Sequence, residues 1–190
     1  TGQVLGVHDC ALSVEAGEIL VLMGLSGSGK STLLRAVNGL NEVVRGRVLV
    51  DGGDGPVDIT HADAAKLRYM RRECISMVFQ QFGLLPWRNV LDNVAFGLEL
   101  SGMERAEREA KAREQLKLVG LTDWADRKVG ELSGGMQQRV GLARALTAGT
   151  DIMLMDEAFS ALDPLIRMDM QTVLLDLQEE LHKTIVFITH

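Results

Sequence analysis

Cysteine is scarce in this sequence, since Cys10 and Cys74 are the only two in 190 residues. They form no Cys-x-x-Cys pair and no Cys/His cluster, so the sequence suggests no zinc site. We expect both to be small buried hydrophobic residues of a protein from a reducing, cytosolic compartment. A chain of this length buries enough surface to fold without a disulfide or a metal.

Two other features are also lacking. The apolar stretch Ile19–Leu25 is only strand-length, whereas a membrane-spanning helix needs about 20 apolar residues. The start of the sequence resembles no signal peptide, and we interpret both ends as cut from a longer chain. Acidic residues outnumber basic ones, 26 to 20, for a net charge of −6. This balance argues against a nucleic-acid-binding protein, which usually carries a basic face.

Strand and helix patterns alternate along the sequence. We predict an antiparallel strand, a turn at Ala16-Gly17 and then a buried central strand from Glu18 to Met23. Another strand or a hairpin is predicted over 45–60, with turn residues at Asp51–Gly53. Further strands are predicted at 74–80, 151–156 and 184–190, with helices at 31–40, 62–72, 134–148 and 165–182. Strands that alternate with helices imply a mainly parallel sheet in an α/β fold.

The pattern from residue 82 to about residue 135 is helical and contains no strand signal. Within it, Glu104–Gly120 carries opposite charges four residues apart, which is typical of a solvated helix face. We therefore predict a single domain over residues 1–190, with an all-helical subdomain inserted at about 82–135.

The stretch Gly24–Thr32, GLSGSGKST, matches G-x-x-x-x-G-K-[S/T] between a predicted strand and a predicted helix. That context indicates a phosphate-binding loop rather than a chance glycine turn. Its backbone N–H groups and the helix N-terminus attract phosphate oxygens. We expect Lys30 to reach the β- and γ-phosphates and the Ser31 hydroxyl to bind Mg²⁺. The residues predicted to bind ATP here are Gly24, Leu25, Ser26, Gly27, Ser28, Gly29, Lys30, Ser31 and Thr32.

Two adjacent carboxylates end the predicted strand at 151–156. Asp156 is predicted to hold Mg²⁺ through water, as the acidic partner of a phosphate loop does. Glu157 is predicted to face the γ-phosphate and to polarise the attacking water. The competing interpretation is a capping pair ahead of a turn.

Two further polar residues stand at predicted strand ends. Gln80 is expected to bind Mg²⁺ or water beside the phosphate site, and Gln81 is the competing candidate because strand register does not separate them. A neutral imidazole of His190 at the end of the last strand is able to hydrogen-bond the γ-phosphate. The alternative for His190 is an ordinary surface residue.

A second glycine-rich stretch, Leu132–Arg139 (LSGGMQQR), also precedes a predicted helix. Ser133 is a suitable N-cap, and Gly134 and Gly135 expose further N–H groups. The first loop already surrounds its nucleotide on one side. A second anion site on a separate lobe best suits a γ-phosphate held by another subunit, which predicts a dimer with nucleotide between the chains. An ordinary helix cap is the alternative.

Together these motifs resemble, in order and over the whole chain, those of ATP-binding cassette proteins. Leu132–Arg139 resembles the signature motif of that family, and Ser160–Asp163 (SALD) a later one. The resemblance implies a RecA-like P-loop NTPase fold with a mainly parallel sheet core, an N-terminal antiparallel β subdomain and an inserted helical subdomain. It also implies contacts of Ser133 and Gly135 with the ATP of the partner.

The resemblance assigns the remaining roles as well. Glu157 is the implied general base, His190 the γ-phosphate sensor and Asp163 a contact across the dimer. The implied cofactors are ATP and Mg²⁺. The family usually stacks adenine on an aromatic residue upstream of the phosphate loop, but the first aromatic residue of this sequence is Tyr69.

The stretches at 80–100 and 155–167 resemble the ATPase subunit of quaternary-ammonium importers, the choline and glycine betaine group. Ala158 stands where many import ATPases have proline. The implied partners are a second copy of the ATPase (a homodimer), a transmembrane permease, and a solute-binding protein that acts through the permease. The resemblance also implies that this chain lies at the cytoplasmic side of the membrane, bound to the permease. No nucleic acid is expected.

Two rival functions remain. A soluble signature-motif ATPase acting on DNA or ribosomes is disfavoured, because no long coiled coil lies between Gln80 and Ser133, no second cassette is present and the charge is acidic. A small-molecule P-loop kinase leaves LSGGMQQR unexplained.

The stretch Phe82–Val90, FGLLPWRNV, combines large apolar residues with a glycine and a proline that break any regular period. We expect at least two of the four large apolar side chains to be exposed, Trp87 first, as a contact with a partner protein. The resemblance implies that this partner is the permease. A buried corner of the helical lobe is the alternative. The four residues are Phe82, Leu84, Leu85 and Trp87.

Overall fold

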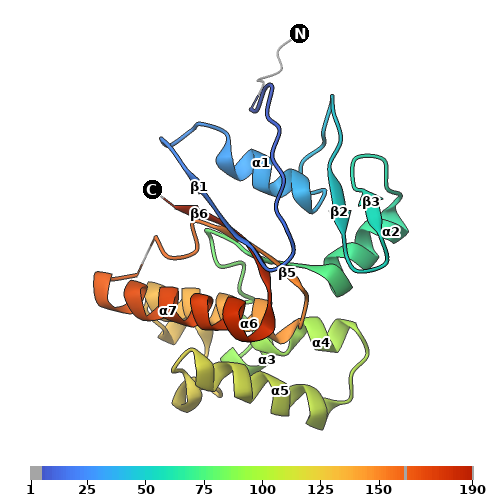
Figure 1. Cartoon of the computed structure of the whole chain (residues 1–190). Helices are drawn as coiled ribbons and strands as arrows, with labels where there is room; N and C mark the ends of the chain where they lie inside the picture. The colour runs from blue at the N-terminus through green and yellow to red at the C-terminus, as the bar shows by residue number, and fades with distance from the viewer. Residues whose placement is uncertain (1–5, 161, 190) are drawn as a thin grey trace.

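The computed structural model describes residues 6–160 and 162–189. Its main sheet has four parallel strands in the order β1-β6-β5-β4. Helices lie on both faces of this sheet, α1 (Lys30–Val37) on one face and α6 (Gly134–Thr147) with α7 (Pro164–Leu181) on the other (Figure 1). The strands are β1 (Ile19–Met23), β4 (Ile75–Val78), β5 (Ile152–Asp156) and β6 (Thr184–Thr189). This is the predicted α/β architecture.

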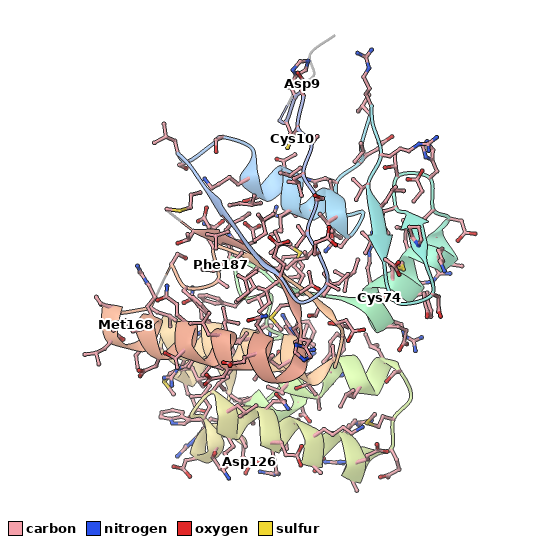
Figure 2. All side chains as sticks on the ribbon, viewed as in Figure 1. Asp9, Cys10, Cys74, Asp126, Met168 and Phe187 are labelled. Carbon is pink, nitrogen blue, oxygen red and sulfur yellow. The ribbon has the colours of Figure 1, made fainter. Side chains whose placement is uncertain are left out.

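Alternate residues of the inner strands face two separate apolar clusters. Phe187 of β6 belongs to the larger cluster, where its ring centroid lies 5.3 Å from that of Phe159 (Figure 2). The preceding residue, Val186, belongs to a second cluster together with Leu34 of α1. Because both faces of the sheet are covered, both sets of alternating side chains must be apolar. This explains the continuous apolar runs in the sequence.

Strand β1 differs from its prediction. It lies at an edge of the sheet and not at the centre, and the side chains of Val21 and Met23 are 45% and 70% exposed. The Ala16–Gly17 turn is present, but residues 6–15 form no strand, so the antiparallel strand expected there is wrong for those residues. The apolar composition of a run determines that a strand forms, whereas its burial depends on which elements lie beside it.

A small antiparallel hairpin stands apart from the main sheet, as predicted from its turn residues. It consists of β2 (Leu49–Asp51) and β3 (Pro56–Asp58). The chain returns through α2 (Ala64–Tyr69), whose first turn is capped by Asp63, and a π-helical turn over Met70–Cys74 leads into β4.

The two cysteines lie in different environments. Cys74 is buried as expected, and burial raises the pKa of its thiol. Cys10 is exposed, so the expectation was wrong for this residue (Figure 2). The reason is that Cys10 belongs to the described part of the segment before β1, which forms no strand and in which only Val14 packs against a core cluster.

Residues 82–135, which we call the helical segment, contain α3 (Val90–Val94), α4 (Phe96–Leu100), α5 (Arg105–Leu118) and two 3₁₀ turns (Thr122–Trp124 and Val129–Glu131). Their only bridge is an isolated one between Asn89 and Lys128. Buried residues of these helices belong to the same cluster as one face of the sheet. The assignment of residues 82–135 as an inserted subdomain within a single domain stays a prediction.

None of the helices in the described part of the chain is long and apolar enough to cross a membrane.

Candidate active site

The predicted phosphate loop connects β1 to α1 in a conformation that requires glycine. Gly24, Gly27 and Gly29 have φ angles of 151°, 79° and 88°, values that residues with a Cβ rarely adopt. A Cβ on Gly29 would also overlap the carbonyl oxygen of Gly6. The Nζ of Lys30 donates to the carbonyl oxygens of Gly24 (2.7 Å) and Leu25 (2.8 Å). An ammonium has three donors, so two of them hold the cation against the loop.

The parallel strands place their carboxyl ends at one edge of the sheet, where ligands bind in folds of this class. Asp156, the last residue of β5, lies at this edge and is fully buried. Its carboxylate accepts a hydrogen bond of 2.6 Å from Ser31 Oγ. The structure therefore brings together two residues predicted to bind Mg²⁺ although they are 125 positions apart in sequence.

The sequence analysis missed Arg35, which also binds Asp156. Its Nε and Nη2 donate to Asp156 Oδ2 at 3.0 and 2.7 Å, in a charge-assisted pair of hydrogen bonds. Arg35 follows Ser31 by four residues in α1, and this spacing places both side chains on one face of the helix. That spacing is the sequence signal that points to Arg35.

The donor set fits a magnesium ion. Mg²⁺ prefers oxygen ligands and is usually bound by one or two protein groups together with waters and substrate phosphates. The Ser31 hydroxyl and the Asp156 carboxylate supply such oxygens, and the Gln80 amide is a third candidate. Among the described residues, no group of three or more His, Cys, Asp or Glu side chains is placed to hold a metal by itself. Waters and substrate phosphates would complete the coordination of an ion held by these residues.

Glu157 directly follows Asp156 and has a left-handed φ of 49°. Such a conformation costs about 1–3 kcal/mol for a residue with a Cβ and is typical of functional sites. The Nε2 of Gln80 donates to Glu157 Oε2 at 2.7 Å. This contact brings Gln80, rather than Gln81, to the carboxylate. The catalytic roles of these residues stay predictions.

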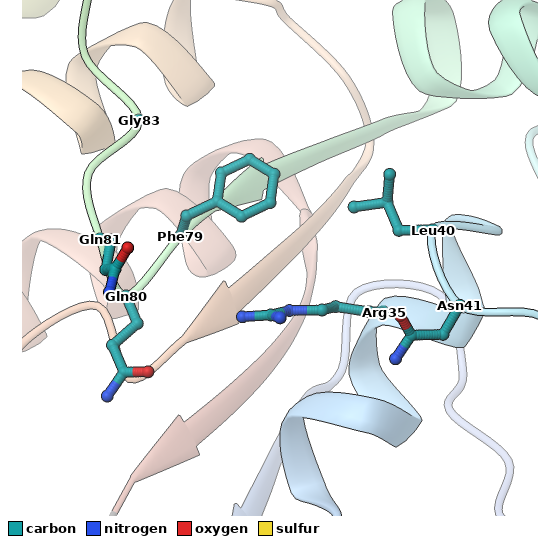
Figure 3. Close-up of a pocket in the computed structure, with 7 residues that line it drawn as sticks. All are labelled: Arg35, Leu40, Asn41, Phe79, Gln80, Gln81 and Gly83. Carbon is teal, nitrogen blue, oxygen red and sulfur yellow. The ribbon is translucent and has the colours of Figure 1, made fainter. Parts of the chain in front are cut away.

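An open pocket of about 600 Å³ adjoins these groups. Figure 3 shows Arg35 extending from α1 toward the chain that follows β4, where Gln80 lies. The wall of the pocket thus combines the arginine that binds Asp156 with the glutamine that binds Glu157. The lining residues are Arg35, Leu40, Asn41, Phe79, Gln80, Gln81 and Gly83.

The second glycine-rich stretch begins α6 as an ordinary helix. Ser133 is the N-cap, and its Oγ accepts a hydrogen bond of 3.3 Å from the Met136 N–H. Gly134 and Gly135 do not have positive φ angles, and a Cβ on Gly134 would meet nothing within 4 Å. Neither the backbone conformation nor the packing of the described chain therefore requires glycine at position 134.

Two predicted site residues remain, Asp163 and His190, and only Asp163 lies within the described residues. Asp163 caps α7, because its Oδ1 accepts hydrogen bonds of 3.1 Å from the N–H groups of Leu165 and Ile166. Its predicted contact across a dimer stays a prediction. His190 lies outside the described residues.

The exposure predicted for FGLLPWRNV is only partly correct. Trp87 is 70% exposed, but Phe82, Leu84 and Leu85 are each partly buried. The expectation of at least two exposed side chains was therefore wrong. Leu84 packs against the larger core cluster, which the broken period of the sequence did not reveal.

The fold and the loop together define a P-loop nucleotide-binding protein of the α/β class. More narrowly, a profile of the ABC transporter family matches residues 7–160, and the chain belongs to this family. Among solved structures, the dimeric post-hydrolysis state of the ATP-binding cassette MJ0796 bound to ADP and Pi has a TM-score of 0.88 at 38% identity. The match covers 94% of this chain and 77% of that chain. The predicted family and fold are thus confirmed.

Curated relatives carry the names of transport systems. The chain is 57% identical over 190 residues to the glycine betaine/proline betaine transport system ATP-binding protein ProV of Escherichia coli, covering 100% of this chain and 46% of the relative. It is 55% identical over 190 residues to the glycine betaine/carnitine transport ATP-binding protein GbuA of Listeria monocytogenes (100% and 47%). It is 54% identical over 189 residues to the trimethylamine N-oxide transport system ATP-binding protein TmoW of Ruegeria pomeroyi (100% and 54%). The chain spans about half the length of these relatives.

Proposed function

We propose that this chain binds and hydrolyses ATP, that two copies close on two ATP molecules, and that the closure drives a membrane permease during solute import. The observation that carries the proposal is the convergence of Lys30, Ser31, Asp156 and Glu157 at the carboxyl edge of the sheet. Family membership and the transport names of the relatives support an importer over a soluble ATPase acting on DNA or ribosomes.

In this proposal the chain's own groups divide the work. The loop N–H groups and Lys30 bind the phosphates. Ser31 and Asp156 hold Mg²⁺, which supplies charge neutralisation when bound. Glu157 accepts the proton of the attacking water, and Gln80, which already donates to Glu157, fixes the direction of that carboxylate.

The second half of the site comes from the other copy. Ser133, Gly134 and Gly135 begin α6 with N–H groups that attract an anion. The open space at Gly134 suits close approach by another molecule. A solved relative of the same fold is described as dimeric and bound to ADP and Pi, which supports this arrangement. Asp163 and His190 would complete the composite site.

The solute follows from the relatives and not from this chain. Their names include glycine betaine, proline betaine, carnitine and trimethylamine N-oxide, all of which have a fully substituted, positively charged nitrogen. We assign a solute of this class, with glycine betaine or choline as the first candidates. The permease and a solute-binding protein would recognise it, while this chain would lie at the cytoplasmic side of the membrane.

Replacement of the general base tests the ATPase proposal. Glu157→Gln should retain ATP binding and slow hydrolysis by about 10²–10⁴-fold, the contribution of one general base. Since the closed dimer then resolves slowly, ATP should trap a dimer that size-exclusion chromatography detects. Asp151→Asn, at the opposite end of β5, is the matched control and should behave as wild type. Normal hydrolysis by Glu157→Gln would reassign the base.

Trp87 tests the permease contact. Trp87→Ala should leave the basal ATPase activity within about threefold and lower solute uptake by the complete transporter at least tenfold, a change of about 1.4 kcal/mol. Leu100→Ala, another exposed apolar residue of the helical segment (64% exposed), is the control. Equal losses of ATPase activity and uptake would assign Trp87 a structural role. Competition for uptake by glycine betaine, choline and trimethylamine N-oxide would identify the solute.

A further inference from the structure

An arginine from a distant helix holds part of residues 81–85, the short segment that directly follows Gln80. Arg144 of α6 donates from Nη1 to the carbonyl oxygen of Gly83 (2.7 Å) and from Nη2 to that of Phe82 (2.9 Å). The partners are 61 and 62 positions apart in sequence. One guanidinium thus binds two consecutive carbonyl groups, which belong to the second and third residues after Gln80.

Glycines lie on both sides of the contact between α6 and this segment. Gly141 precedes Arg144 by three residues on the same face of α6, and a Cβ on it would lie 3.7 Å from the Phe82 carbonyl oxygen. Gly83 itself has a positive φ of 55°, and a Cβ there would lie 3.6 Å from Arg144 Nη2. The helix and the segment therefore contact each other at two glycines, one from each side, and an added Cβ at either position would make an ordinary van der Waals contact.

Burial of the Arg144 guanidinium is energetically unfavourable. Arg144 is partly buried, and burial lowers the pKa of its guanidinium with no neighbouring charge adding to the shift. Several other arginines of the described chain have carboxylate partners, such as Arg88 with Glu99 at 2.7 Å. A desolvated cation without a carboxylate partner lowers stability. The two hydrogen bonds to backbone carbonyls offset that cost and fix the position of the segment.

The far half of the segment is fastened differently. Asn93 of α3 is fully buried and binds both backbone groups of Leu85, accepting from its N–H at 2.7 Å and donating to its carbonyl at 3.1 Å. Arg144 instead holds the near half, next to the glutamine whose amide donates to Glu157. These hydrogen bonds therefore form a continuous path from α6 through Arg144 and the segment to Gln80 and Glu157.

We propose that Arg144 is a positioning residue, which fixes the backbone after Gln80 to α6 so that displacement of α6 changes where Gln80 holds Glu157. α6 begins at Gly134, 10 residues before Arg144, or about 15 Å along a helix. A group that binds at the start of α6 would thereby change the position of Gln80, and with it Glu157, because α6 moves as a rigid helix. The inference rests on the proposed function in that Glu157 acts on ATP.

The scarcity of cysteine allows a direct test. Cys10→Ser removes the exposed thiol while Cys74 is buried, so Gln81→Cys in that background accepts a nitroxide label at an exposed position beside Gln80. Electron paramagnetic resonance then reports the mobility of the segment without nucleotide. Arg144→Gln should raise the mobility of this label, and Arg144→Lys, which can still reach one carbonyl, should raise it less.

Arg71 provides a matched control. Its Nε and Nη2 donate to two consecutive carbonyls, those of Asn38 (2.8 Å) and Gly39 (2.9 Å), at the end of α1. Arg71→Gln removes the same kind of contact in another part of the fold and should leave the mobility of the label at position 81 unchanged.

Kinetics supply the second readout, measured without the label. Arg144→Gln should lower kcat about tenfold and leave the KM for ATP within about threefold, because Arg144 does not contact the phosphate loop; Arg144→Lys should recover part of kcat. Unchanged label mobility in Arg144→Gln, or equal effects from Arg71→Gln, would overturn the inference. Absence of ATPase activity in the wild type would instead overturn the proposed function, and the label mobility would still decide the role of Arg144.

Discussion

The two glycine-rich loops of this chain each precede a helix, yet their glycines have different physical causes. In the loop before α1, glycines are required by left-handed φ angles and by the contact of Gly29 with Gly6. In the loop before α6, Ser133 caps an ordinary helix start and Gly134 lies in open space. The chain itself thus explains the glycines of the first loop, whereas nothing in the described residues requires glycine at position 134.

The helices behind the two loops also carry arginines toward different targets. Arg35 of α1 binds the carboxylate of Asp156 directly. Arg144 of α6 binds backbone carbonyls and reaches Glu157 only through Gln80. The first helix thus shapes the site of its own chain by contact. The second helix acts on that site through the segment between them.

The largest effect is expected at the first loop. Lys30→Ala should reduce ATP binding and hydrolysis to background, because the loop loses its cation and each charge-assisted hydrogen bond contributes about 1.5–3 kcal/mol. Circular dichroism should show an unchanged fold, since the Lys30 ammonium contacts the loop and not the core. Lys66→Ala on α2 is the control. Wild-type ATP turnover by Lys30→Ala would contradict the assignment of residues 24–32 as a phosphate-binding loop. It would also contradict the comparison of the two glycine-rich loops.

Ser133→Arg should give the next largest effect, and it should act on the other subunit. The variant should still bind nucleotide at its own phosphate loop while homodimers lose hydrolysis by about 10²-fold, the scale of one lost stabilising group. Mixed dimers with Lys30→Ala contain one intact composite site and one doubly altered site. They should hydrolyse ATP faster than either homodimer. If the mixed dimers gain nothing, the second loop does not serve the partner's nucleotide.

The smallest expected effects are changes in stability, and a matched pair of glycine substitutions should separate the two loops through them. Gly29→Ala should lower the free energy of unfolding by at least about 1–2 kcal/mol, because alanine is strained at positive φ and its Cβ would overlap Gly6. Gly134→Ala should leave it unchanged or raise it by up to about 1 kcal/mol, since alanine favours helix. Thermal unfolding measures both.

The same pair distinguishes the cause of the second glycine. If another subunit approaches Gly134, Gly134→Ala should hydrolyse ATP about tenfold more slowly despite its undiminished stability. Full hydrolysis by this variant would show that the space beside Gly134 is not used.

Local chemistry determined most of the predicted elements. Gly29 and Ser133 start helices because a left-handed turn and a hydroxyl cap act within a few residues. The runs that became β5 and β6 are apolar on both faces, and this composition requires cover on both sides. The sequence by itself therefore sufficed for the phosphate loop, the parallel sheet and the family.

Tertiary structure alone decided what depends on neighbours distant in sequence. It placed β1 at an edge, left Cys10 exposed and chose Gln80 over Gln81 as the partner of Glu157. It also brought Arg144 to a segment more than 60 positions away. Such contacts depend on which elements pack side by side, and no local period encodes that choice, because burial and hydrogen-bond partners are properties of the assembled chain.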